Sequence, residues 1–199
     1  MRRFTAAMIA LLLGATPLVA SAQAQNLGRK DFVGLPRPYV ESIVKGEAAF
    51  VTKDWVAATA AFQEATKLEP SRMIAFYRLG EAQRAAGKLD EAEGSWQAAL
   101  GKQGPDDLKA KVMFVVADLR ERQGKWDAAK TAWQGYATFV NGTKGARGFP
   151  ATATERIKQA ERRMKDEKDY GAVKERAAQR EVEKAKEAEE NAKKDKLNR

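Results

Sequence analysis

The stretch that decides the fold is residues 73–102, which read MIAFYRLGEAQRAAGKLDEAEGSWQAALGK. Each half carries apolar residues at helical spacing: Phe76, Leu79 and Ala82 in the first, and Leu89, Ala92, Trp96 and Ala99 in the second. Neither helix can bury its apolar face alone. The short link through Gly87 therefore predicts an antiparallel helix hairpin, in which Gly80 and Ala92 are small enough for the backbones to approach.

The same unit recurs on both sides of this stretch. Three turns align with one another: Lys53-Asp54-Trp55, Gly87-Lys88-Leu89 and Gly124-Lys125-Trp126. A small residue follows each turn (Ala58, Ala92, Ala129), and four residues later comes an aromatic one (Phe62, Trp96, Trp133). The spacing is 34 residues from Lys53 to Gly87 and 37 from Gly87 to Gly124. About three residues are therefore inserted, near residues 104–106.

A repeated hairpin with this period resembles the tetratricopeptide repeat, over about three repeats in residues 38–140. The resemblance implies an all-α fold in which antiparallel hairpins stack as a short right-handed α-solenoid. We expect a repeat array with a capping helix over residues 38–166. The resemblance also implies a protein that binds other proteins, and we expect this protein to be bacterial, exported and not an enzyme.

The N-terminus carries the pattern of a secretory signal peptide over residues 1–24. A basic Met1-Arg2-Arg3 precedes an apolar stretch, and small-x-small sites follow it at Ala20-Ser21-Ala22 and Ala22-Gln23-Ala24. A membrane anchor is the alternative, but about fifteen apolar residues are fewer than the roughly 20 needed to span a bilayer. Residues 25–37 would be a leader, and the mature protein would be periplasmic or, alternatively, extracellular.

Composition limits the chemistry that the chain can perform. The chain has 199 residues, a net charge of +9, no histidine and no cysteine. The commonest general base, zinc ligands and thiol nucleophile are therefore missing, and we expect no catalytic residue, no metal and no cofactor. Glu47, Glu81 and Asp118 share one position in the first helices of successive repeats. We interpret them as a solvated acidic stripe or as part of a binding groove, which is a simpler interpretation than catalysis.

The resemblance implies that the first helix of each repeat lines a concave face, which binds a peptide or a helix of a partner protein. The expected partner-binding residues are Val40, Ile43, Glu47, Phe50, Tyr77, Arg78, Glu81, Arg84, Lys111, Phe114, Asp118 and Glu121. One known version of this groove clamps a C-terminal carboxylate with lysine, asparagine and arginine. Only Lys111 and, loosely, Arg78 agree with that version, so it is not carried over.

Other aromatic residues are expected in the core, because they occupy the packing positions of the repeat: Trp55, Phe62, Trp96, Trp126 and Trp133. A capping box of Thr152 and Glu155 predicts the start of the capping helix. Residues 167–199 are rich in lysine, glutamate, arginine and alanine. They predict a charged tail that is a solvated helix, a partly disordered extension or a coiled coil.

These features together predict a non-catalytic adaptor or scaffold of the bacterial cell envelope. The alternative is a surface-associated protein whose basic tail binds anionic lipid or cell-wall polymer. Nucleic acid is not an expected partner, because acidic residues alternate with the lysines of the tail and export would separate the protein from most nucleic acid.

Overall fold

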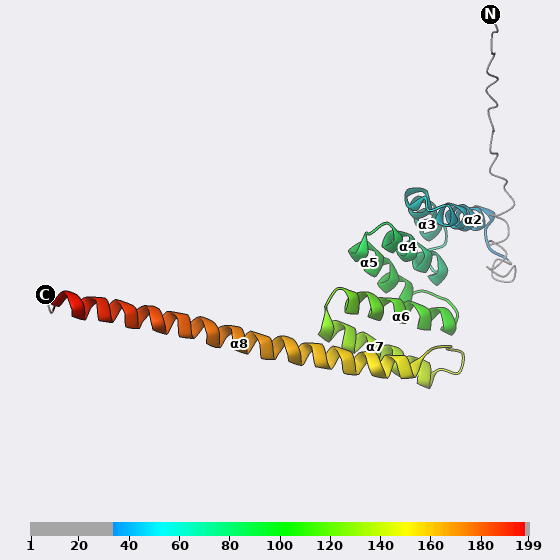
Figure 1. Cartoon of the computed structure of the whole chain (residues 1–199). Coiled ribbons are helices and arrows are strands. Elements are labelled where there is room, and N and C mark those ends of the chain that lie inside the picture. Colours follow the sequence, from blue (N-terminus) through cyan, green and yellow to red (C-terminus); the bar gives the residue numbers. More distant parts are fainter. Residues whose placement is uncertain (1–33, 198–199) are drawn as a thin grey trace, which may run out of the picture.

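The computed structural model of the chain describes residues 34–197, and the expected signal peptide and most of the leader lie outside these residues. The described part forms seven α-helices: α2 (Arg37–Val51), α3 (Trp55–Leu68), α4 (Met73–Ala85), α5 (Leu89–Leu100), α6 (Asp106–Arg122), α7 (Trp126–Gly142) and α8 (Pro150–Leu197). Figure 1 shows α2 to α7 stacked in chain order, with α8 leaving the stack as a long helix. The all-α expectation is confirmed.

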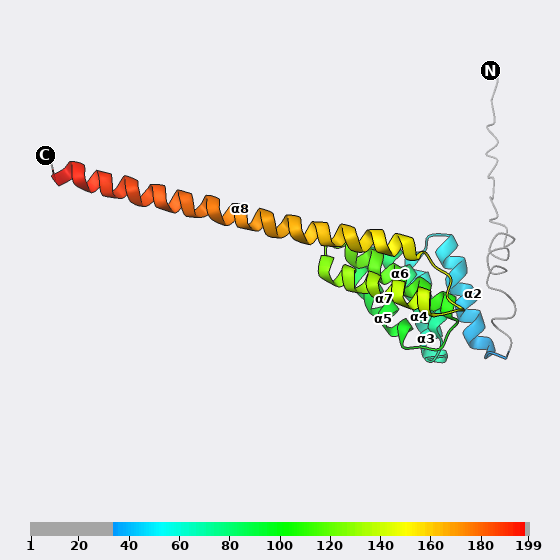
Figure 2. The same ribbon diagram turned by 90° about the horizontal axis from the view of Figure 1, so that it is seen from below.

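The helices pair as the sequence predicts. Helices α2 and α3, α4 and α5, and α6 and α7 pack against each other as hairpins, and each hairpin packs on the next. We call α2–α7 the repeat array and refer to α2, α4 and α6 as the A helices and to α3, α5 and α7 as the B helices. The first part of α8 packs on α7, where an A helix of a fourth repeat would lie (Figure 2).

The three hairpin turns share one backbone conformation. Gly87 and Gly124 have φ of 79° and 70°, and Lys53 occupies the same place in the first hairpin with φ of 61°. This left-handed conformation costs a residue with a Cβ about 1 to 2 kcal/mol, which glycine avoids. The alignment of the three turns in the sequence is therefore confirmed, and the first repeat keeps the turn without its glycine.

Each hairpin buries one large aromatic side chain of its B helix against a small residue of its A helix. Phe62, Trp96 and Trp133 are fully buried. A Cβ built on Gly46 would overlap the Phe62 ring, and one built on Gly80 would overlap the Trp96 indole. The close approach expected at Gly80 therefore involves the indole of Trp96, which also donates a hydrogen bond of 3.2 Å to the Tyr77 carbonyl.

Two of the five expected core aromatics are not in the core. Trp55 and Trp126 are only half-buried, because they stand at the first position of α3 and α7, where the hairpin turn leaves one side of the ring uncovered. Trp55 packs edge-on against Phe50 with ring centroids 5.1 Å apart. Leu89, at the equivalent position of α5, is 39% exposed.

The inserted residues lengthen α6 at its N-terminus. Helix α6 begins at Asp106, about one turn before the position that aligns with Met73 at the start of α4. The loop before it pairs with the loop before α4, since Gln103 donates a backbone hydrogen bond of 2.8 Å to Ser71 and accepts one of 2.9 Å from Met73. The insertion thus fits into the stack without disturbing it.

Helix α8 begins earlier than the sequence predicted. Its first residue is Pro150, whose fixed φ suits a helix start, so Thr152 lies inside the first turn and the expected capping box is wrong. Ala153 and Ala160 are buried against the array. The helix continues without a break through the expected boundary at residue 167. Within residues 34–197, no helix combines the length and the apolar character that crossing a bilayer requires.

Candidate functional site

The A helices form the inner face of a curved stack. Helix α4 packs directly on α6, and Glu47 of α2 forms an ion pair of 2.6 Å with Arg78 of α4. Within the described residues, contacts of that extent are lacking between α3 and α5 and between α5 and α7. Because α4 and α6 lie closer together than α3 and α5 or α5 and α7, and because the Glu47–Arg78 pair links α2 to α4, we place the A helices on the concave side, as the resemblance implied.

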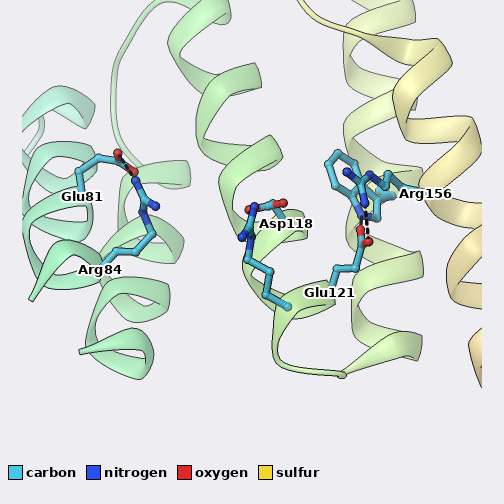
Figure 3. Close-up of polar contacts among 7 residues, drawn as sticks. Glu81, Arg84, Asp118, Glu121 and Arg156 are labelled. Carbon is cyan, nitrogen blue, oxygen red and sulfur yellow. Dashed lines mark hydrogen bonds and ion pairs between the residues drawn. The ribbon is translucent and has the colours of Figure 1, made fainter. Parts of the chain in front are cut away.

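A carboxylate stands at the same position of each A helix, and each is paired within the chain. Glu47 pairs with Arg78 at 2.6 Å, Glu81 with Arg84 at 3.1 Å and Asp118 with Arg122 at 2.7 Å. Figure 3 shows the pairs of Glu81 and Asp118 in neighbouring helices. The row is therefore largely neutralised, and no group of three or more metal-ligating side chains occurs among the described residues.

Glu47 is the most enclosed carboxylate of this row, with a side chain that is 12% exposed. Burial raises the pKa of Glu47, and the positive charge of Arg78 opposes that rise. An ion pair that is partly removed from water holds its geometry better than an exposed one, but it adds little net stability. Its structural effect is to link α2 to α4 on the concave side.

Tyr77 was expected to face a partner, but its side chain is only 3% exposed and offers a partner little surface in this structure. Burial raises the pKa of the Tyr77 hydroxyl well above its usual range. Two cations lie near its ring: the Arg78 guanidinium carbon is 5.8 Å from the ring centroid and the Lys111 ammonium 5.4 Å. The exposed parts of Arg78 and Lys111 therefore form the surface here.

Two further expected contact residues are also buried. Ile43 is 0% exposed and belongs to the core formed by α2, α3 and α4. Glu121 is 9% exposed and accepts a hydrogen bond of 3.0 Å from the indole nitrogen of Trp133 and one of 2.8 Å from Arg156 of α8. Figure 3 shows Glu121 and Arg156 facing each other between α6 and α8. Glu121 therefore attaches α8 to the array.

The remaining nine expected residues are half-buried or exposed on the A helices. We call them the concave surface: Val40, Glu47, Phe50, Arg78, Glu81, Arg84, Lys111, Phe114 and Asp118. Among these, Arg84 and Lys111 are the most accessible cations. Phe114 stacks edge-on with Trp133 and Tyr136, with ring centroids 4.9 Å and 5.5 Å apart, so one side of its ring is fixed by the core. The concave surface thus combines fixed aromatic groups with paired charges.

Several polar contacts between helices had no signal in the sequence. Arg156 reaches Glu121 across 35 residues, and Arg120 of α6 pairs with Glu93 of α5 at 2.7 Å. Burial would raise the pKa of Glu93, but the hydrogen bond and charge of Arg120, together with Lys125 at 3.5 Å, keep its pKa below the ordinary value of 4.5. Such pairs join side chains whose separation depends on how whole helices pack.

No protein-family model and no curated protein sequence matches the chain. Solved structures do match, at low sequence identity. PcrH in complex with the chaperone-binding region of PopD aligns with a TM-score of 0.54 and 18% identity, over 66% of this chain and 97% of that one. The TPR2B domain of yeast Sti1, in a complex with pHsp70, aligns with a TM-score of 0.53 and 16% identity, over 64% and 98%.

The Sgt2 TPR domain from Aspergillus fumigatus gives a similar result, with a TM-score of 0.52 and 16% identity over 67% of this chain and 83% of that one. Identities this low establish the fold alone. The chain is a short right-handed α-solenoid with the tetratricopeptide repeat fold, and α8 extends it at the C-terminal end.

Proposed function

We propose that the chain is a non-catalytic scaffold that holds a peptide or a helix of a partner protein against its concave surface. The observation that carries the proposal is the concave surface itself, which brings side chains of three consecutive A helices onto one open face. A face of this kind offers several weak contacts in a row instead of one enclosed pocket. Extended or helical segments suit it better than a small molecule does.

The make-up of the concave surface also suits a protein segment. Phe50 and Phe114 offer aromatic area that is held in place by neighbouring rings, so little side-chain entropy is lost on binding. Arg84 and Lys111 add accessible cations on the same surface. Aromatic residues and arginine are the groups that most often dominate protein interfaces. Two of the similar structures, PcrH with PopD and Sti1 with pHsp70, are themselves complexes with a protein partner.

We further propose that the scaffold acts in the bacterial cell envelope, after export to the periplasm. This part rests on residues 1–24, which carry the pattern of a signal peptide. N-terminal sequencing of the protein recovered from a periplasmic fraction should give a chain that begins near Gln25. A chain that keeps residues 1–24 in the membrane fraction would contradict the proposal.

Binding to anionic lipid through the tail has less support. Between residues 168 and 197 the sequence has nine basic and eight acidic residues, so this segment has a net charge of only +1. Attraction of a segment to an anionic membrane grows with its excess of lysine and arginine, by about 1 kcal/mol each near the surface. The net positive charge of the protein therefore lies mainly outside the tail. The tail was expected to be basic, but its charge is nearly balanced.

Affinity capture from a cell-envelope extract tests the proposed function, with three forms of the chain that starts at Gln25. The first is the parent, the second carries Arg84→Glu and Lys111→Glu, and the third ends at Lys168. Both substituted side chains are exposed, so the variant should fold like the parent. Its circular dichroism spectrum and urea midpoint would confirm that it does.

We expect one protein to be retained by the parent and by the shortened form and lost by the double variant. A matched control reverses two exposed lysines away from the A helices, Lys67→Glu in α3 and Lys144→Glu in the loop after α7, and should retain the partner. Capture that survives in the double variant and disappears in the shortened form would overturn the proposal and favour the tail.

A further inference from the structure

The last 30 described residues of α8 extend beyond every helix of the array (Figures 1 and 2). The last side-chain contact between α8 and the array is a hydrogen bond of 2.6 Å between the Trp126 indole and Glu167. We propose that residues 168–197, which we call the arm, form a rigid helical spacer that holds its far end about 45 Å from the array, at a rise of about 1.5 Å per residue.

The direction of the arm is set where α8 packs on the array. Ala153 and Ala160 are buried there, and four polar contacts follow one another along the helix: Arg156 to Glu121 at 2.8 Å, Glu161 to Lys130 at 2.9 Å, the Arg163 guanidinium over the Trp126 ring at 5.9 Å, and Glu167 to the Trp126 indole at 2.6 Å. These contacts reach α6 and both the first and the second turn of α7. A helix attached at several levels along its length cannot swing at the point of attachment.

The arm keeps its helix without tertiary contacts because its sequence suits a helix. It is made mostly of alanine, glutamate, lysine and arginine, which have the highest helix propensities, and it contains no proline. Ion pairs one turn apart occur at Lys184 and Glu181, 3.0 Å, and at Lys193 and Glu189, 3.1 Å. The packed part of α8, residues 150–167, also acts as the helix nucleus, so the arm avoids a nucleation factor of about 10⁻³.

The charges of the arm do not favour folding back onto the array or pairing with the arm of a second copy. Acidic and basic residues alternate along it, and its net charge is +1. The larger apolar side chains of the arm whose exposure is described are Tyr170, Val173 and Val182, which are 71%, 56% and 56% exposed and do not keep a heptad spacing. A single solvated helix is therefore the state that the sequence favours.

Gly171 is the weakest point of the proposed spacer. It lies four residues after Glu167, and a Cβ built on it would meet nothing within 4 Å, so no packing requires a glycine there. Glycine lowers the local helix equilibrium by a factor of about 5 relative to alanine. A hinge at Gly171 is thus the main competing description, and replacing this residue separates the two.

Distance measurement between pairs of spin labels tests the proposal on the full chain, which has no cysteine of its own. Labels at Gln159→Cys and Glu190→Cys, both exposed, span 31 residues. A continuous helix gives a narrow distribution centred at about 46 Å. If the arm were a flexible coil beyond Glu167, the distribution would be broad and centred at about 30 Å.

A second pair, Thr131→Cys and Glu190→Cys, measures the direction of the arm relative to α7, where Thr131 is exposed. We expect a single narrow distribution that Gly171→Ala leaves unchanged and that Gly171→Pro broadens. A broad distribution that narrows in Gly171→Ala would replace the rigid arm by a hinge and overturn the proposal. Trp126→Phe removes the hydrogen-bond donor to Glu167. It should broaden the distance distribution of this pair more than that of the pair within α8.

Single-label controls at Glu190→Cys complete the test. No dipolar signal is expected from them at micromolar concentration. A defined intermolecular distance would mean that the arms associate as a coiled coil, and the proposal of a lone spacer would fail. The outcome is independent of what the concave surface binds, because the labels and variants lie outside that surface.

Discussion

The repeat array and the arm are both helical, yet different forces hold them in that state. In the array each hairpin buries an aromatic side chain completely, as at Phe62, Trp96 and Trp133. In the arm every side chain whose exposure is described is exposed, except that of Ala172, which is half-buried. The array therefore depends on packing between helices, whereas the arm depends on helix propensity and pairs of charges within one helix.

This difference predicts where substitutions matter. A change in the array alters contacts between helices that are far apart in the sequence, so its effect should be large and cooperative. A change in the arm alters only neighbours one turn away, so its effect should be small and local. The predictions below proceed from the largest expected effect to the smallest.

Trp96→Ala should destabilise the array most. The side chain is fully buried between α4 and α6, and removing such a residue costs about 3 to 5 kcal/mol, a large part of the 5 to 15 kcal/mol of a typical domain. Urea unfolding followed by circular dichroism measures the loss. Trp55→Ala, at a half-buried position, is the control and should lose clearly less. Equal losses of stability in the two variants would mean that burial of these side chains does not determine the stability of the array.

Gly80→Ala should destabilise the array by about 1 to 3 kcal/mol, because the added methyl group would overlap the Trp96 indole and force the core to shift. Gly94→Ala in α5 is the matched control, since its Cβ would meet nothing within 4 Å. It should stabilise the chain by about 0.5 to 1 kcal/mol through helix propensity. Urea midpoints of the two variants should therefore move in opposite directions, and a shift in the same direction would contradict this packing.

Glu121→Gln should cost about 1 to 3 kcal/mol. The carboxylate accepts from both Trp133 and Arg156, and an amide has one oxygen for the two donors. Urea unfolding followed by tryptophan fluorescence measures the change. Asp118→Asn on the same helix is the control, because its partner Arg122 is 75% exposed and such pairs contribute below about 1 kcal/mol. A smaller loss at Glu121 than at Asp118 would contradict the attachment of α8 through Glu121.

Acid should weaken one ion pair of the array in a defined pH range. The pKa of Glu93 is lowered in the folded chain, so its contribution to stability is present above the ordinary value of 4.5 and is lost as the pH falls through the folded pKa. The stability of the parent relative to Glu93→Gln should therefore decline below about pH 4.5. Glu47, whose pKa is raised, should give the opposite slope when compared with Glu47→Gln. If the two comparisons gave pH slopes of the same sign, the opposite pKa shifts assigned to Glu93 and Glu47 would be contradicted.

High salt should affect the arm more than the array, and only slightly. Each exposed pair such as Lys184 and Glu181 adds about 0.2 to 0.5 kcal/mol, and 1 M salt screens most of it. The difference in helical signal between the full chain and a form ending at Lys168 should shrink modestly in 1 M sodium chloride. The urea midpoint of the shortened form should hardly change. A large salt effect on the shortened form would mean that ion pairs contribute more to the stability of the array than packing does.

The fold could be predicted from the sequence because its signals are local and repeated. The turn glycines Gly87 and Gly124 and the small residues after them lie within single hairpins, and the 34-residue spacing relates one hairpin to the next. None of these signals requires knowledge of distant contacts. The insertion near residues 104–106 was visible in the same way, although its effect, an earlier start of α6, was not.

The candidate site was predicted less well, because repeat register gives the face of a helix but not what covers it. Tyr77 lies on the expected side of α4, yet α6 covers it and leaves 3% exposed. Glu121 lies under α8, which the register of three repeats does not include. The Thr152 capping box was wrong for a local reason, since the helix already starts at Pro150, two residues before Thr152. Burial by a neighbouring helix is the information that the sequence lacks.

Site-specific photo-crosslinking tests most directly the central claim that the array binds a partner on its concave surface. A photoreactive residue would replace Lys111 on the concave surface, Gln97 on the exposed side of α5, or Arg180 in the arm, each in the full chain; all three positions are exposed. We predict a crosslinked product with a partner protein from a cell-envelope extract at position 111 and none at position 97. A product at position 180 or 97 but not at 111 would contradict the claim.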